Sequence, residues 1–251
     1  MLKIENFEVL GWEHAIRGMR NPMNSWEKSD STFFDDSEGH VCNICQGHGS
    51  MSLIEIGPND YALMKNLRNA GTDHRKFMRM ITVYLDITAP LYWWKEFDTY
   101  KVGTVANSCS TMHKIAAKEF DVNDFSHEHI EELDGDEYNM SYDWLLRTVD
   151  ILNYYRKEYS IASEKLKRTD LTEAERKHVL AQQKLYWWQM IQVLPTSYNQ
   201  KRTVMLNYEV LANIYKSRRN HKLDEWHTLC DWIEELPYSE LITGKEYEVE
   251  E

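Results

Sequence analysis

The spacing of apolar residues predicts a strand and then a short helix at the start of the chain. Apolar and polar residues alternate across 2–10 (LKIENFEVL), which is the period of a strand with one buried face. A helix is expected from Trp12 to about Arg20. It ends at Asn21-Pro22, because proline lacks the backbone N–H that a continuing helix needs.

Residues 23–58 follow no clear hydrophobic period and are rich in Ser, Asp, Asn and Gly. A loop of this length in a compact domain is usually functional or disordered, so we expect a lid-like loop here. Pro58-Asn59-Asp60 then begins a helix that stops at Gly71. The following strand, residues 80–87, is rich in β-branched and aromatic side chains, and Ala89-Pro90 ends it.

The second half of the chain has mainly helical spacing. A helix resumes at LYWWKEF, and a long helical hairpin is expected over 138–195. Thr172-Glu173-Ala174-Glu175 marks the turn of this hairpin, because it fits a capping box. A last helical region is expected from about Thr203 to Leu236. These elements predict an α+β fold, with a mixed or antiparallel sheet packed with long helices in a single domain, 1–251.

Composition and charge exclude several classes of protein. The sequence has no run of about 18 apolar residues that would cross a membrane, and its first residues lack the apolar centre of a signal peptide. Its four unevenly spaced cysteines predict no disulfide framework, which suits a reducing, cytoplasmic location. A net charge of −12 disfavours binding to long nucleic acid, which needs many Lys and Arg contacts. Two or three local cations are still enough to hold the phosphate of one nucleotide.

A stripe of residues near the C-terminus is the most informative feature for function. If the region is one helix, Asn207, Leu211, Ile214, Arg218 and Glu225 lie close to one line at about 100° per residue. Burying such polar groups without partners is costly, so each of them needs a partner. Arg218 either pairs with a carboxylate across a subunit interface or binds a ligand.

The same stretch resembles the flavin-dependent thymidylate synthases. That family carries a Leu-Pro, an Asn about a dozen residues later, a second Asn six residues on, and an Arg five beyond it. Leu194-Pro195, Asn207, Asn213 and Arg218 have this spacing without a gap. The resemblance implies that Asn207 and Asn213 approach the flavin and that Arg218 binds the nucleotide.

Upstream residues follow the order of the family as well. A helix ends at Arg20 with Ser25 close behind it, and a Gly71-to-His74 segment precedes the strand that enters Ala89-Pro90. The resemblance implies flavin contacts at Ser25 and His74. A histidine in such a loop also commonly caps a helix or lies in solvent, and that alternative stays open.

The family's signature, R-H-R-x-x-S-x-N-E-x-S-x-R-Y, is eroded in the matching segment KEFDTYKVGTVANSCSTMHK. Counting without a gap places Thr99-Tyr100-Lys101 on the Arg-His-Arg, Asn107 on the Glu and Cys109 on the second Ser. Allowing one inserted residue places Asn107 on the Asn, Ser108 on the Glu and Ser110 on the second Ser. In both alignments Lys101 is the only cation left from the Arg-His-Arg, and lysine offers a point charge instead of a bidentate fork.

The resemblance implies a fold like that of the thymidylate synthase-complementing proteins and transfer of a one-carbon unit to C5 of dUMP. FAD is then the cofactor, methylenetetrahydrofolate the folate donor and NADPH the reductant, in a homotetramer with sites between subunits. Flavin contacts are implied at Ser25, His74, Lys101, Asn107, Asn207 and Asn213. Nucleotide contacts are implied at Glu96, Ser108, Ser110 and Arg218, with Ser110 and Arg218 catalytic.

The missing arginines leave two alternatives to that reaction. One is a flavoenzyme that modifies a different pyrimidine deoxynucleotide. The other is a non-catalytic relative that binds nucleotide or a protein partner. Retention of Asn207, Asn213 and Arg218 favours a site that still binds its ligands.

A second cluster of potential ligands surrounds Cys42 and Cys45. His40 and His48 are close in sequence, and four such side chains are enough for zinc. Their crowding differs from the usual spacing of zinc fingers, so a zinc clip, a redox pair and ordinary loop cysteines all stay open. We expect ordinary cysteines and no resident metal.

Overall fold

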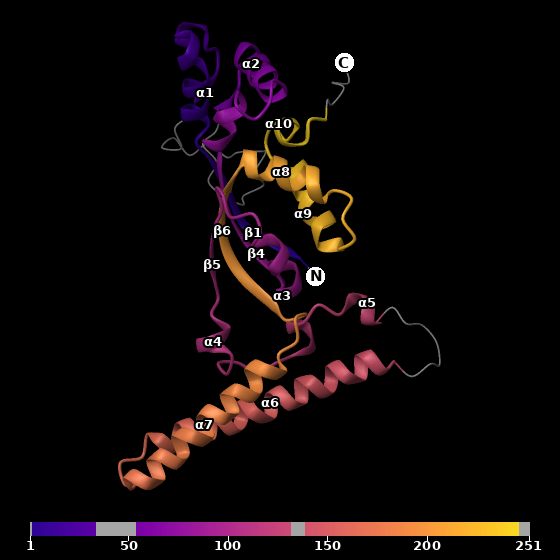
Figure 1. Cartoon of the computed structure of the whole chain (residues 1–251). Coiled ribbons are helices and arrows are strands. Elements are labelled where there is room, and N and C mark those ends of the chain that lie inside the picture. Colours follow the sequence, from indigo (N-terminus) through magenta and orange to yellow (C-terminus); the bar gives the residue numbers. More distant parts are fainter. Residues whose placement is uncertain (1, 34–53, 132–138, 246–251) are drawn as a thin grey trace. The chain divides into compact units, whose positions relative to one another are not determined.

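The computed structural model describes residues 2–33, 54–131 and 139–245 (Figure 1). They form a four-stranded antiparallel sheet in the order β1-β4-β6-β5 and a two-stranded sheet of β2 and β3. The fold is therefore α+β, as predicted. The strands are β1 (Lys3–Leu10), β2 (Thr32–Phe33), β3 (Ile54–Glu55), β4 (Thr82–Pro90), β5 (Val105–Ser108) and β6 (Asn199–Asn207).

Helices account for most of the remaining described residues. The α-helices are α1 (Trp12–Arg20), α2 (Pro58–Asn69), α3 (Leu91–Phe97), α4 (Thr111–Lys114), α5 (Glu128–Glu131), α6 (Met140–Leu166), α7 (Glu173–Val193), α8 (Tyr208–Arg218), α9 (Asp224–Glu234) and α10 (Glu240–Thr243). Short 3₁₀ helices are η1 (Asn21–Met23), η2 (Trp26–Lys28), η4 (Arg75–Arg79) and η5 (Val122–Asp124).

The chain divides into two compact units. Apart from Met1, the first unit comprises residues 88–95 and 108–201. The second comprises residues 2–87, 96–107 and 202–251. Each unit is described below by itself.

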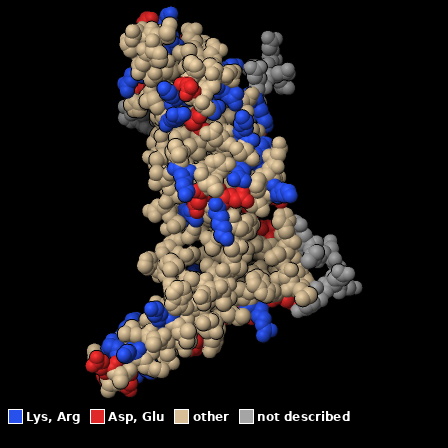
Figure 2. Space-filling model, in the orientation of Figure 1, with Lys and Arg blue, Asp and Glu red and all other residues tan. Residues whose placement is uncertain are grey.

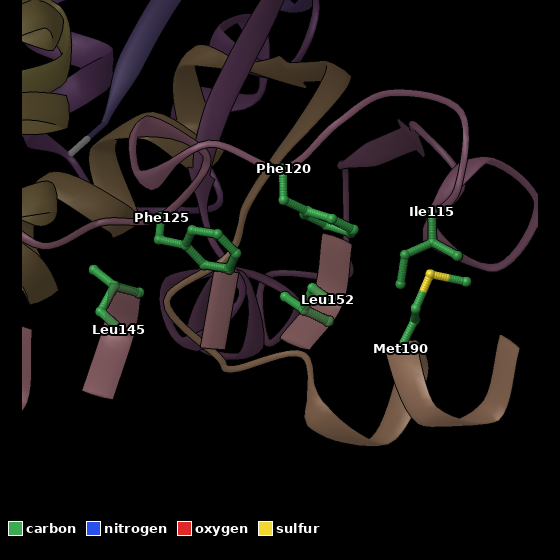
Figure 3. Packing of buried hydrophobic residues seen from close by; sticks show 6 residues of the cluster. All are labelled: Ile115, Phe120, Phe125, Leu145, Leu152 and Met190. Carbon is green, nitrogen blue, oxygen red and sulfur yellow. The ribbon is translucent and has the colours of Figure 1, made fainter. Parts of the chain in front are cut away.

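A hairpin of α6 and α7 is the main feature of the first unit, where the two helices lie side by side (Figure 1). Both fall within 138–195. The backbone N–H of Glu175 donates to Thr172, and the backbone N–H of Thr172 donates to Glu175, so the predicted capping box is present. The buried cluster beneath the hairpin (Figure 3) consists of Ile115, Phe120, Phe125, Leu145, Leu152 and Met190.

The second unit packs around α8. Trp12 of α1 meets Tyr208 and Tyr238 edge-on, with ring centroids 5.3 Å apart in each pair. Alternate residues of β4, such as Val83 and Leu85, are buried, as its β-branched pattern predicts. Helix α8 also packs against α9, α10 and η4, so these elements support the residues that α8 presents.

The prediction of one helical region from Thr203 to Leu236 is wrong at its start, which is a strand, and the remainder is divided into two helices. Residues 199–207 form β6, in which Val204 and Leu206 are buried between more exposed neighbours, the period of a strand. Helix α8 then ends at Arg218, and α9 begins at Asp224. Glu225 therefore belongs to a different helix and not to the stripe that ends at Arg218.

Some sequence predictions fall outside the described residues. These include the cysteine pair Cys42 and Cys45 with His40 and His48. The described parts of the predicted loop, 23–58, contain η2, β2 and β3. Across 2–33, 54–131 and 139–245, no group of three or more His, Cys, Asp or Glu side chains is arranged to hold a metal ion. None of the described helices has the length and apolarity needed to cross a bilayer.

Candidate functional site

Arg218, the last residue of α8, lies among polar and aromatic side chains of the second unit. Its Nε donates to Tyr100 Oη (2.9 Å) and its Nη1 donates to Glu96 Oε2 (2.6 Å). The guanidinium lies 4.7 Å from the centroid of the Trp226 ring and 5.6 Å from that of Tyr100. These contacts hold it in one orientation. Its Nη2 has no hydrogen-bond partner among the described residues.

Glu96 joins three side chains through a single oxygen. Its Oε2 accepts from Arg218 and from Trp226 Nε1 (3.1 Å), and it lies 3.3 Å from His221 Nε2. The backbone N–H of Leu223 donates to His221 Nδ1 (3.2 Å), so the neutral ring carries its proton on Nε2, the nitrogen that lies nearest to Glu96. Glu96 Oε1 has no such partner in the described part of the chain. One carboxylate oxygen and one guanidinium nitrogen are thus available to a ligand.

A pocket of about 240 Å³ shares Tyr100 with this cluster. It is lined by residues 99–102 and, from α8, by Val210 and Asn213. The loop that lines it approaches α8 closely at Gly103, which has a φ of +78°. A Cβ there would lie 3.0 Å from Asn207 Nδ2 and 3.1 Å from Val210 Cγ2, so glycine permits both the backbone angle and the close approach.

Asn207 caps the start of α8. Its Oδ1 accepts from the backbone N–H of Val210 (3.0 Å), which explains how β6 turns directly into the helix. The cap fixes the amide group, and its Nδ2 faces the backbone at Gly103. Asn207 therefore has a structural role whether or not it also contacts a cofactor.

Arg75 brings an additional cation to Asn213. Its Nη2 lies 3.5 Å from Asn213 Oδ1, and its Nε lies 2.9 Å from Glu209 Oε2. The Nε–H is not aligned for a hydrogen bond with Glu209, so this contact is ionic only. The neighbouring His74 is exposed, and its backbone N–H donates to Gly71 O. The structure thus presents Arg75, rather than His74, to Asn213.

Ser25 lies in a segment that a buried ion pair holds to α2. Arg20 Nε donates to Asp60 Oδ1 (2.6 Å), and Arg20 Nη1 donates to Ser25 O (3.3 Å). Asp60 Oδ2 accepts from the hydroxyls of Ser29 and Ser31 (2.7 Å each). Burial alone would raise the pKa of Asp60, but hydrogen bonds from Ser31, Ser29 and Arg20 outweigh it and hold that pKa below its ordinary value.

The remaining predicted residues are Asn107, Ser108 and Ser110. Asn107 is exposed in β5, and neither it nor Ser25 makes a polar contact with Arg218 or Glu96 in the described part of the chain. Ser108 and Ser110 belong to the first unit. Ser110 Oγ accepts from the backbone N–H of His113 (3.1 Å) and caps α4.

The structure gathers five of the predicted residues in the second unit, around α8 and the 96–103 segment: Glu96, Lys101, Asn207, Asn213 and Arg218. It adds Arg75, Tyr100, His221 and Trp226, which sequence reasoning missed. Tyr100 falls on the His of the Arg-His-Arg in the ungapped alignment, and this was the one available signal.

Comparison with known proteins identifies the fold. No family model and no curated protein matches the sequence. The structure is similar to flavin-dependent thymidylate synthase ThyX from Helicobacter pylori complexed with FAD and dUMP, at a TM-score of 0.59 and 15% identity over 96% of this chain and 98% of that chain. A second structure of that enzyme with FAD and dUMP has a TM-score of 0.58 and 14% sequence identity, over 97% of this chain and 98% of that chain. The structure is also similar to a UMP/dUMP methylase, PolB from Streptomyces cacaoi, bound with 5-Br dUMP. The TM-score is 0.51 and the sequence identity 13%, over 97% of this chain and 95% of that chain. The chain shares the fold of these enzymes along nearly its whole length.

Proposed function

We propose that the protein is a flavin-dependent enzyme that transfers a one-carbon unit to C5 of a uracil nucleotide, with dUMP as its substrate. The observation that carries the proposal is the Arg218 cluster. An oriented guanidinium, held by Glu96, Tyr100 and Trp226, keeps one donor nitrogen and one acceptor oxygen available. The similar structures of ThyX contain FAD and dUMP, which supports this choice of ligands.

The two available atoms suit a uracil ring. Uracil presents carbonyl oxygens, which accept hydrogen bonds, beside an N3–H, which donates one. Arg218 Nη2 can donate to a carbonyl, and Glu96 Oε1 can accept from N3–H. A cation beside a ring carbonyl also stabilises the enolate-like form of uracil, in which the carbonyl oxygen carries negative charge and C5 is nucleophilic. In this role Arg218 is both a binding and a catalytic residue.

The pocket beside α8 suits one part of a flavin. At about 240 Å³ it is too small for all of FAD, so it would hold one portion of the cofactor. Lys101 and Asn213, which line the pocket, offer a cation and an amide group. Asn207 Nδ2 lies beside Gly103, next to this lining, and the buried Thr104 Oγ1 has no hydrogen-bond partner among the described residues. When bound, FAD would supply the redox chemistry of the transfer, with methylenetetrahydrofolate and NADPH as co-substrates. Arg75 and Lys101 offer positive charge in place of the missing signature arginines.

A second candidate function is methylation of a different pyrimidine nucleotide. The similarity to PolB, a UMP/dUMP methylase, favours it, as does the eroded signature.

We also propose that the protein forms the homotetramer that the resemblance to the flavin-dependent thymidylate synthases implies.

Release of tritium from C5 of labelled dUMP tests the reaction. With FAD, NADPH and methylenetetrahydrofolate present, we expect tritium release that requires all three, because replacement of the C5 hydrogen accompanies transfer. Labelled UMP in parallel distinguishes the second candidate. A protein that retains flavin yet releases no tritium from either nucleotide would contradict both reactions and leave a non-catalytic nucleotide-binding relative.

A further inference from the structure

One face of α6 carries large apolar side chains that the described residues leave exposed. Their exposed fractions are 72% for Met140, 56% for Trp144, 37% for Ile151, 58% for Tyr154 and 52% for Ile161. A soluble surface rarely concentrates so many large apolar groups on one helix without a partner for them. A groove of about 800 Å³ follows the same helix and is lined by α6 side chains alone.

The exposed residues form a regular stripe. Together with Arg147 and Glu158 they recur at alternating intervals of three and four residues from Met140 to Ile161, the spacing of a coiled-coil seam. The buried face of α6, which includes Leu145 and Leu152, lies about 100° round the helix and packs in the core of the unit (Figure 3). The helix thus has two seams, and α7 and the core occupy only one.

The exposed stripe is complementary to itself when reversed. If a second α6 packs antiparallel, with a two-fold axis between Leu152 and Asn153, Arg147 of each copy faces Glu158 of the other. The same register places Trp144 opposite Ile161 and Ile151 opposite Tyr154, so apolar side chains meet apolar ones. At the ends Met140 faces Lys165, whose aliphatic stem can lie along it. Shifting the register by one heptad, seven residues, moves Arg147 opposite Ile151 or Lys165 and loses the charge pairing.

We propose that α6 is an antiparallel, two-fold interface with a second copy of this chain. The stripe from Trp144 to Ile161 is about 26 Å long at 1.5 Å per residue and contains Trp, Tyr and Arg, residue types that are enriched at interface centres. Arg147 and Glu158 form no ion pair with any described residue, so each is available to the other copy. Charged side chains of both signs gather instead at the turn between α6 and α7 (Figure 2). This interface does not depend on the proposed reaction.

Charge exchange across the stripe tests the register. Arg147→Glu places Glu opposite Glu twice per interface, and Glu158→Arg places Arg opposite Arg. We expect each to weaken self-association at least about tenfold in sedimentation equilibrium, as like charges replace opposite ones. The double variant should return to within about threefold of the wild type, because it restores both pairs with their signs exchanged. Lys157→Glu, an exposed charge off the stripe on the same helix, is the matched control and should change nothing.

Disulfide trapping tests the contact directly, even if other interfaces also hold copies together. Trp144→Cys and Ile161→Cys proteins are mixed and oxidised, and the products are mapped by peptide mass spectrometry. A disulfide joining positions 144 and 161 is expected in the mixture and in neither protein alone. A monomeric wild type at tens of micromolar, double charge variants no better than the single ones, or a mixture without that disulfide would each overturn the proposal.

Discussion

Arg218→Ala is expected to weaken dUMP binding about 100-fold, a loss of roughly 2.7 kcal/mol. The change removes an oriented guanidinium, held by Glu96 and Tyr100, whose Nη2 is the donor that the proposal assigns to uracil. Isothermal titration with dUMP measures the loss. We expect the oligomeric state to be unchanged, because the contacts of Arg218 lie within its own chain.

The next residue provides a matched control for this variant. Arg219 contacts Asp231 and Glu234 instead of Glu96, so Arg219→Ala should bind dUMP as the wild type does. Glu96→Gln separates the two parts of the cluster: it should weaken binding if Oε1 accepts from N3–H, and tighten it if Glu96 only competes for Arg218. If Arg218→Ala dissociates the oligomer while each subunit still binds dUMP normally, Arg218 is an interface residue and the assignment is wrong.

Asp60→Ala is expected to lower the free energy of unfolding by about 3–5 kcal/mol, the range for breaking a buried ion pair. Asp60 is fully buried and Arg20 is 4% exposed, so the variant leaves a cation without its partner. It also removes the acceptor of the Ser29 and Ser31 hydroxyls. Urea unfolding measures the change, and Asp73→Ala, at an exposed aspartate, should shift stability by less than about 0.5 kcal/mol.

The Asp60 carboxylate also makes the free energy of unfolding depend on pH. Because the native pKa of Asp60 lies below its ordinary value, its contribution is fully present above about pH 4 and is lost as pH falls through the native pKa. The stability difference between wild type and Asp60→Asn should therefore shrink below pH 4. A difference that stays constant from neutral pH down to pH 2 would show that the ionised carboxylate is not what stabilises the segment.

Elements with strong local signals could be predicted from the sequence. Helix α1 begins at Trp12 and ends at Arg20 as expected, because an amphipathic period is followed by Asn21-Pro22. The capping box at Thr172 likewise depends only on neighbouring residues. Strand β6 was missed because residues 199–207 fit either period weakly, and only pairing with β4 and β5 decides between them.

The candidate site likewise contains residues that local sequence predicts and residues that only tertiary packing brings together. The spacing of Asn207, Asn213 and Arg218 follows from one stretch of sequence and could be found. Trp226 and Tyr100 approach Arg218 because separate segments pack together, and no local pattern carries that information. Asn207 caps α8 because β6 ends at this residue. The prediction of a helix that begins at about Thr203 placed Asn207 inside the helix, so its capping role was missed.

Flavin retention tests the central claim most directly. The purified protein is incubated with FAD, freed of unbound cofactor by gel filtration, and its absorbance is recorded across the flavin bands before and after dUMP is added. We expect a flavin band that co-elutes with the protein and shifts with dUMP, because the pocket beside α8 and the Arg218 cluster share Tyr100. Protein that elutes without flavin would contradict the proposed flavoenzyme.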